Sequence, residues 1–252
     1  MATTRTTHVK MALMLGACAV IATLALQPFL VMTEPAVMSK LRVPFFVIAV
    51  LQGGLPNFFL GWLGLSLGSQ YGLDAPWLRA FVDPSRREPV IRTRWGLAAL
   101  TGFVAGALVE GLNHMGPSVL PPTGDVSPLG QAWRGALASL YGGTAEEILM
   151  RLFLVTLFVW VFALFNRRQA RPCMFVFAIA LAALLFGAAH LGYAFSVGIS
   201  HTPLLIGKIV LLNALVGWVT GTLFWKYGLE HAMLAHFCAD LVLHVATPFL
   251  SP

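Results

Sequence analysis

Charged residues are scarce in this chain. Asp, Glu, Lys and Arg together make up 10% of the 252 residues, whereas soluble globular proteins carry about 25%. Apolar residues make up 58%, and the mean hydropathy is +0.80. A soluble fold of this length has too little interior for so many apolar side chains, so the surplus must face lipid. The composition therefore excludes a soluble globular protein and indicates an integral membrane protein.

Cysteine is also scarce, and the basic residues do not form a nucleic-acid-binding pattern. Cys18, Cys173 and Cys238 form no CxxC pair and lie in or beside apolar runs, so they are expected to be small apolar residues of membrane helices. The net charge is +6, but no basic stripe is interleaved with aromatic residues. We expect the lipid bilayer, and no nucleic acid, as a partner.

Seven segments are long and apolar enough to cross a membrane, which takes about 20 apolar residues in a helix. They cover approximately residues 11–32, 43–69, 95–113, 144–165, 172–195, 203–225 and 229–250. The second is long enough to be broken at Gly53-Gly54 or Pro56. Residues 128–141 are apolar but too short to span, and they form either a re-entrant or interfacial helix or an extension into an eighth span. The prediction is an all-α transmembrane helix bundle of seven or eight spans, with residues 1–252 as one membrane domain.

Lys and Arg residues predict the orientation, because they are enriched in cytoplasmic loops. Only Lys40 and Arg42 border the spans on one side. On the other side, which includes the N-terminus, lie Arg5, Lys10, Arg79, Arg86, Arg87, Arg92, Arg94, Arg167, Arg168, Arg171 and Lys226. We therefore expect the N-terminus in the cytoplasm. The location that we expect, a bacterial inner membrane, is a separate prediction that does not follow from these charges.

The first of three polar motifs within the apolar segments is Glu146-Glu147-x-x-x-Arg151. A charge at membrane depth costs at least about 2.5–3.5 kcal/mol, so such a side chain faces the bundle interior and usually has a function. Glu147 and Arg151 are four residues apart, so they share a helix face and can pair. Glu146 is turned about 100° away and is free to point elsewhere. The alternative, a solvated surface salt bridge, requires water that is absent beside the apolar residues that follow.

The other two motifs are Phe186-x-x-x-His190 and His236-x-x-x-Asp240, each in a different apolar segment. The spacing of the last pair lets the carboxylate orient the imidazole, and His244 continues the same stripe. Each motif has a structural alternative when taken singly. His190 can be a packing residue, and His236 with Asp240 can be an interhelical hydrogen-bonding face.

The three motifs in this order resemble the active-site signature of the CAAX proteases and bacteriocin-processing enzymes, a family that includes the type II prenyl-protein endopeptidases. The likeness covers about residues 130–245, which would form the catalytic core. It implies an intramembrane endopeptidase that hydrolyses a peptide bond near the membrane surface. The substrate would be a peptide or protein, either lipidated or bacteriocin-like.

The resemblance also implies roles for individual residues. Glu146 would be the essential catalytic carboxylate, and with His190 it would bind and activate a water molecule. His236 would stabilise the oxyanion. Glu147 and Arg151 would hold the helix and aim Glu146.

Asp240 and a metal are the two open points of this mechanism. The prenyl-protein members have Asn where this chain has Asp240, and an ionised Asp beside an oxyanion would repel it. Asp240 is therefore either protonated or, as we favour, orients His236 without touching substrate. Two His and a carboxylate are also suitable ligands for zinc, but no HExxH motif is present. We favour a glutamate mechanism without a cofactor, with zinc as the alternative.

Other functions compete with the protease. A proton-coupled transporter would use Glu110, Glu146, Asp240 and the histidines as a relay, although no internal repeat supports it. A family member without activity would serve as a membrane scaffold or partner subunit. The predicted orientation also places Glu146 and His190 towards the outer face, whereas the prenyl-protein proteases open to the cytosol. Either this chain acts on the other side, or the span count differs by one.

Overall fold

The computed structural model describes residues 2–86, 93–117, 119 and 125–250, and every regular element in these ranges is a helix. In the first half of the chain the elements are α1 (Ala2–Thr33), α2 (Pro35–Met38), α3 (Phe45–Ile48), η1 (Ala49–Gly54), α4 (Leu55–Gly68), α5 (Pro76–Val82), η2 (Pro84–Arg86) and α6 (Trp95–Asn113). In the second half they are α7 (Pro128–Tyr141), η3 (Gly142–Glu146), η4 (Ile148–Val155), α8 (Thr156–Leu164), α9 (Pro172–Ser196), α10 (Pro203–Tyr227), α11 (Leu229–Leu241), η5 (Val242–Ala246) and α12 (Thr247–Leu250).

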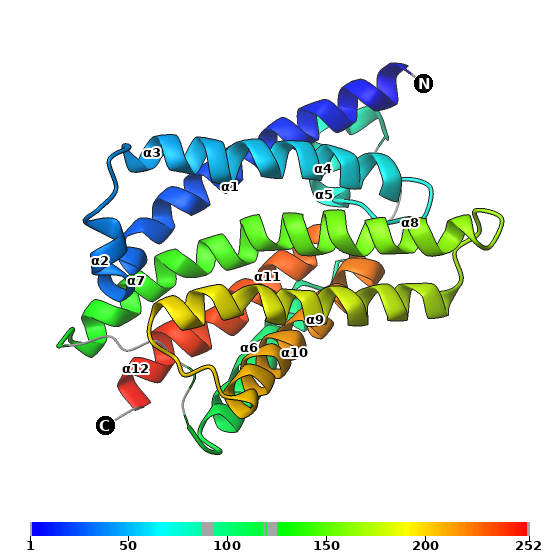
Figure 1. Cartoon of the computed structure of the whole chain (residues 1–252). Helices are drawn as coiled ribbons and strands as arrows, with labels where there is room; N and C mark the ends of the chain where they lie inside the picture. Colours follow the sequence, from blue (N-terminus) through cyan, green and yellow to red (C-terminus); the bar gives the residue numbers. More distant parts are fainter. Residues whose placement is uncertain (1, 87–92, 118, 120–124, 251–252) are drawn as a thin grey trace.

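Seven of the helical runs in the described ranges are long and apolar enough to cross a membrane, which confirms the all-α polytopic prediction. The runs are Arg5–Thr33, Phe45–Gly68, Trp95–Asn113, Pro128–Leu164, Pro172–Ser196, Pro203–Tyr227 and Leu229–Leu250. The second run continues through Gly53-Gly54 and Pro56 as η1 and α4, so it is not broken there. The chain is therefore an integral membrane protein built as a helix bundle (Figure 1).

The segment 128–141 is neither a separate re-entrant helix nor an eighth span. It forms α7 and continues through η3 and η4 into α8 as one run of 37 residues. At 1.5 Å per residue this run is about 55 Å long, well beyond the about 30 Å of the hydrocarbon core. The fourth span is thus an unusually long helix, and Glu146 lies near its middle.

Glycines allow the helices around this long run to approach closely. A Cβ atom at Gly102 or Gly106 of α6 would collide with the backbone of Ala235 or Ala239 of α11. Gly106 is one turn after Gly102, and Ala239 is one turn after Ala235, so α6 and α11 run in the same direction. The two helices pack through these small residues. Gly102 and Gly106 therefore allow the backbones of the two helices to come into direct contact.

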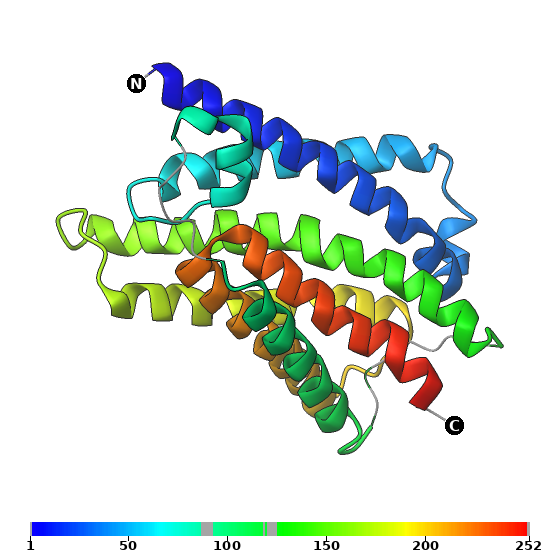
Figure 2. The same cartoon turned by 180° about the vertical axis from the view of Figure 1, so that it is seen from behind.

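The bundle has two distinct ends (Figures 1 and 2). The N-terminus and the turn between α8 and α9 lie at one end, and the loop between α1 and α3, the loop between α9 and α10 and the C-terminus lie at the other. Arg167, Arg168 and Arg171 are in the turn at the first end, and Lys40 and Arg42 are at the second. The structure thus places these three arginines at the opposite end from Lys40 and Arg42, whereas Arg87 and Arg92 of the larger basic group lie outside the described residues.

Candidate active site

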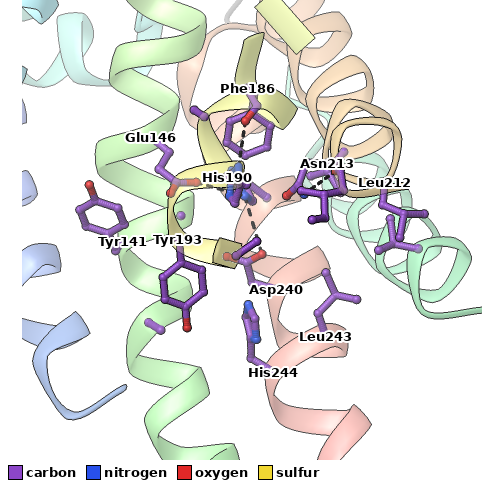
Figure 3. A pocket seen from close by; sticks show the side chains of 18 of the residues that line it. Tyr141, Glu146, Phe186, His190, Tyr193, Leu212, Asn213, Asp240, Leu243 and His244 are labelled. Atoms are coloured by element: carbon purple, nitrogen blue, oxygen red, sulfur yellow. Dashed lines mark hydrogen bonds and ion pairs between the residues drawn. The ribbon is translucent and has the colours of Figure 1, made fainter. Parts of the chain in front are cut away.

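The three polar motifs meet in the interior of the bundle, where the long fourth span packs against α9 and α11. Glu146 ends the π-helical segment η3 and Glu147 precedes a second one, η4. Another π-helical segment, η5, begins two residues after Asp240. Such segments rotate the side chains that follow them relative to an α-helix and occur frequently at functional sites. Figure 3 shows Glu146, His190 and Asp240 on three different helices around one space.

Glu147 is the centre of a fully buried polar network. Its Oε1 atom accepts a hydrogen bond from Nδ1 of His236 at 2.8 Å and lies 3.1 Å from Nη2 of Arg151. Arg151 in turn donates from Nε to Oγ1 of Thr220 on α10 at 2.8 Å. Glu147 and Arg151 are both 0% exposed, so the ion pair predicted from their spacing exists without solvent. The network ties the fourth span to α10 and α11 and fixes the orientation of the His236 ring.

Glu146 points in a different direction from Glu147, as the sequence predicts. Its side chain is 25% exposed and lines a cavity, and its Oε2 lies 3.8 Å from Nε2 of His236. Oδ1 of Asp240 lies 3.7 Å from the same Nε2 atom. Both distances exceed that of a hydrogen bond. The hydrogen bond that orients the ring therefore comes from Glu147 on the Nδ1 side, while Glu146 and Asp240 flank the Nε2 side.

His190 presents one ring nitrogen to the same cavity. Its Nδ1 lies 2.8 Å from the carbonyl oxygen of Phe186, one turn earlier on α9. A carbonyl oxygen only accepts hydrogen bonds, so Nδ1 carries the hydrogen and Nε2 is the nitrogen that can accept one from water. Glu146 and His190 both line the cavity, so a water molecule there has two acceptors available.

Phe186 packs between the charged groups. The guanidinium carbon of Arg151 lies 4.9 Å from the centre of its ring. The rings of His190 and His236 meet it edge to face, with centroids at 4.6 and 5.5 Å. The phenylalanine of the FxxxH motif thus fixes both histidines and gives the buried cation an aromatic contact.

Two residues that the motifs do not include also build the site. A Cβ atom at Gly142 would collide with the carboxylate of Asp240 and lie 3.3 Å from Nε2 of His236. Because Gly142 has no side chain, the carboxylate of Asp240 and the ring of His236 can lie close to the backbone of the fourth span. The Gly142-Gly143 pair, which ends three residues before Glu146, is the sequence signal for this close approach. The second such residue is Thr220, which accepts the hydrogen bond from Arg151. No sequence motif marks it, because its role depends on the packing of α10 against the fourth span.

The cavity has a volume of about 470 Å³ and lies in one half of the bundle. Its walls come from the last turns of α1 and α6, the second half of α9 and the first half of α10, together with the fourth and seventh spans. Apolar residues such as Phe29, Leu149 and Leu212 make up most of the lining. This is the half that ends at the loops with Lys40 and Arg42, away from the arginine-rich end.

A zinc centre, the alternative left open by the sequence, does not fit the residues present. Within the described ranges, no three His, Cys, Asp or Glu side chains come together in a way that could hold a metal ion. No step of the chemistry below therefore passes through a metal.

Comparison with known proteins supports the resemblance. The family model described as "Type II CAAX prenyl endopeptidase Rce1-like" matches residues 128–242. This range contains all three motifs, from Glu146 to Asp240. Neither the curated proteins nor the solved structures give a match to the chain.

Proposed function

Because residues 128–242 match the family model of type II CAAX prenyl endopeptidases, we propose that this chain is an active intramembrane endopeptidase in which Glu146 and His190 activate a water molecule. The observation that carries the proposal is the convergence of the three motifs. Carboxylates from the fourth and seventh spans lie 3.8 and 3.7 Å from one nitrogen of His236, beside a cavity that His190 also lines.

The attack begins with a water molecule held between Glu146 and Nε2 of His190. Glu146 accepts a proton as the water oxygen bonds to the peptide carbonyl carbon, and the carbonyl oxygen becomes an oxyanion. The carbon–nitrogen bond then breaks, and the proton passes from Glu146 to the leaving amine. The products are one new carboxyl group and one new amine, and Glu146 returns to its initial state.

His236 stabilises the oxyanion in this mechanism. Its Nδ1–H is held by Glu147, so a hydrogen on Nε2 can be donated to the oxyanion without rotation of the ring. Glu147 does not act as a base itself, because its charge is paired with the buried Arg151. Asp240, 3.7 Å from Nε2, restricts the ring from the other side, which is the orienting role that we propose for it.

We also propose that the substrate enters from the non-cytoplasmic side of a bacterial inner membrane. The cavity lies in the half of the bundle opposite the end with Arg5, Lys10 and the arginines between α8 and α9. With that basic end in the cytoplasm, Glu146 is reached from the outer leaflet. The apolar lining suits a membrane-associated peptide, whether lipidated or bacteriocin-like. An impermeant quenched peptide should be cleaved by intact spheroplasts, and cleavage only after lysis would refute this sidedness.

The test of the activity is cleavage of a quenched-fluorescent peptide library by purified protein in detergent. We expect Glu146→Gln to lower kcat by at least about a thousandfold and His190→Gln by about a hundredfold, as expected for lost general acid–base groups. Glu34→Gln, which replaces a partly buried carboxylate outside the cavity, is the matched control and should keep the wild-type rate. A wild-type protein that cleaves nothing while folded would favour a scaffold, and ion-dependent flux in liposomes would favour a transporter.

A further inference from the structure

A second buried carboxylate lines the cavity, and the mechanism above does not use it. Glu110 lies in the last turn of α6 and is 7% exposed. Neither of its carboxylate oxygens has a hydrogen-bond partner among the residues that the structure describes. A buried polar group without a partner is costly, so its presence requires an explanation.

The basic residues near Glu110 do not satisfy it. Lys208 donates from Nζ to the carbonyl oxygens of Asn113 and Pro117, both at 2.7 Å. Nδ1 of His114 lies 3.3 Å from the Glu110 carboxylate but only 3.0 Å from the backbone carbonyl oxygen of the same residue, which competes for its hydrogen. The His114 side chain is also 61% exposed, so the pair is weak.

A structural role does not explain this carboxylate either. The C-terminal end of a helix carries partial negative charge, so a carboxylate in the last turn of α6 is disfavoured. An apolar residue at this position would be enough to pack α6 against its neighbours. The preceding residue, Val109, already does so in a small buried cluster with residues of α10 and α11. Glu110 therefore costs stability, and a bound ligand is the remaining source of a partner for it.

The surroundings of Glu110 define the class of ligand. Val109, which precedes Glu110 in the chain, and Leu212 of α10 belong to one small buried cluster. Asn213, which follows Leu212, also lines the cavity. Asn213 donates its Nδ2 hydrogen to the carbonyl of Ile209, which leaves its amide oxygen as an acceptor (Figure 3). A carboxylate and an amide oxygen facing a mostly apolar cavity are suited to an ammonium or guanidinium group.

The position of Glu110 in α6 indicates how far from the scissile bond a bound ammonium or guanidinium group would lie. Gly106 packs against Ala239, directly before Asp240, and Glu110 is one turn further along α6. One turn is about 5.4 Å, and an extended peptide advances about 3.3 Å per residue. A basic side chain within about three residues of the scissile bond can therefore reach the carboxylate.

We propose that Glu110 forms a specificity subsite that binds a lysine or arginine side chain of the substrate peptide. The proposal rests on the proposed protease function, and it adds that the enzyme selects peptides with one basic residue near the cleavage site. Glu110 contacts the substrate and takes no part in bond cleavage.

The test uses octapeptide libraries with Lys, Arg, Gln, norleucine or Glu at each position, and compares wild type with two variants of Glu110. We expect wild type to prefer Lys or Arg over Gln at one position by at least about tenfold in kcat/KM, the effect of one charge-assisted hydrogen bond. Glu110→Gln should reduce the preference to within about twofold through KM, and Glu110→Lys should reverse it in favour of Glu. Asp125→Asn, which removes an exposed carboxylate outside the cavity, is the control and should keep the preference.

Stability distinguishes this role from a structural one. Glu110→Gln should melt at or above the wild-type temperature, because it removes a buried charge that has no hydrogen bond and only a weak pair with His114 among the described residues. A clear fall in the melting temperature would overturn the proposal. An unchanged preference for basic residues in Glu110→Gln would also overturn it, while the protease function would stand. If wild type cleaves no peptide, the proposed function fails. Binding of fluorescent peptides then tests the subsite by itself. Wild type that binds lysine peptides more tightly than norleucine peptides, with the difference lost in Glu110→Gln, would support the subsite. Equal binding of the two peptides by wild type would refute it.

Discussion

Replacing Glu147 by leucine should destabilise the protein far more than the same change at its neighbour Glu146. Glu147→Leu leaves Arg151 buried at 0% exposure without its ion-pair partner, and among the described residues its side chain then keeps the Thr220 hydroxyl as hydrogen-bond partner and the ring of Phe186 beside it. The change also removes the acceptor for Nδ1 of His236. Removing one partner of a buried ion pair costs about 3–5 kcal/mol. At about 2–4 °C per kcal/mol for a chain of this size, Tm should fall by about 6–20 °C.

The assay is a thermal melt of purified protein in detergent, with Glu146→Leu as the matched control. The Glu146 side chain is 25% exposed to the cavity and has no hydrogen bond to lose among the described residues, so its replacement should change Tm by less than about 4 °C. The double variant Glu147→Leu/Arg151→Met should recover most of the loss, because it leaves no unpaired charge. It should remain inactive, because His236 is no longer oriented. Equal melting of the two single leucine variants would refute this division of roles.

Three further predictions concern the groups around His236. Gly142→Ala should lower kcat by at least about tenfold with little change in Tm, because the added Cβ displaces the Asp240 carboxylate. The control is Gly192→Ala, which should leave the rate unchanged because no atom lies within 4 Å of an added Cβ there. Asp240→Asn should keep at least about a third of the activity, since the amide restricts the ring and cannot repel the oxyanion, whereas Asp240→Leu should lose most of it; inactivity of both would contradict the orienting role. A chelator such as 1,10-phenanthroline should leave the cleavage rate unchanged, and loss of activity restored by Zn²⁺ would contradict the metal-free mechanism.

The spans could be predicted because the bilayer requires about 20 apolar residues per helix, and the chain supplies them in separate runs. The length of the fourth span could not be predicted from the sequence. Gly142-Gly143 is typical of a break in a soluble helix, but backbone groups in lipid must be hydrogen-bonded within their own helix. The chain therefore continues through the glycines as a π-helical segment, and residues 128–141 become part of the same helix.

The local part of the site could likewise be predicted, because it depends only on helix geometry. The Glu147–Arg151 pair and the different direction of Glu146 both follow from spacing on one helix. The hydrogen bond between Glu147 and His236 joins residues 89 positions apart, and the one between Arg151 and Thr220 joins residues 69 apart. Such contacts depend on how the helices pack, so the sequence assigned the orientation of His236 to its neighbour Asp240 and did not predict the contact from Glu147.

The most direct test of the central claim, that Glu146 activates water and does not attack the peptide itself, is cleavage in H₂¹⁸O over many turnovers, followed by mass spectrometry of both peptide and protein. We expect ¹⁸O in the new carboxyl group of the peptide product, none in the Glu146 side chain, and no cleavage by Glu146→Gln. Accumulation of ¹⁸O in the Glu146 carboxylate would show a covalent intermediate on that residue, and cleavage by Glu146→Gln at the wild-type rate would show that the base lies elsewhere. Either result would contradict the proposed role of Glu146.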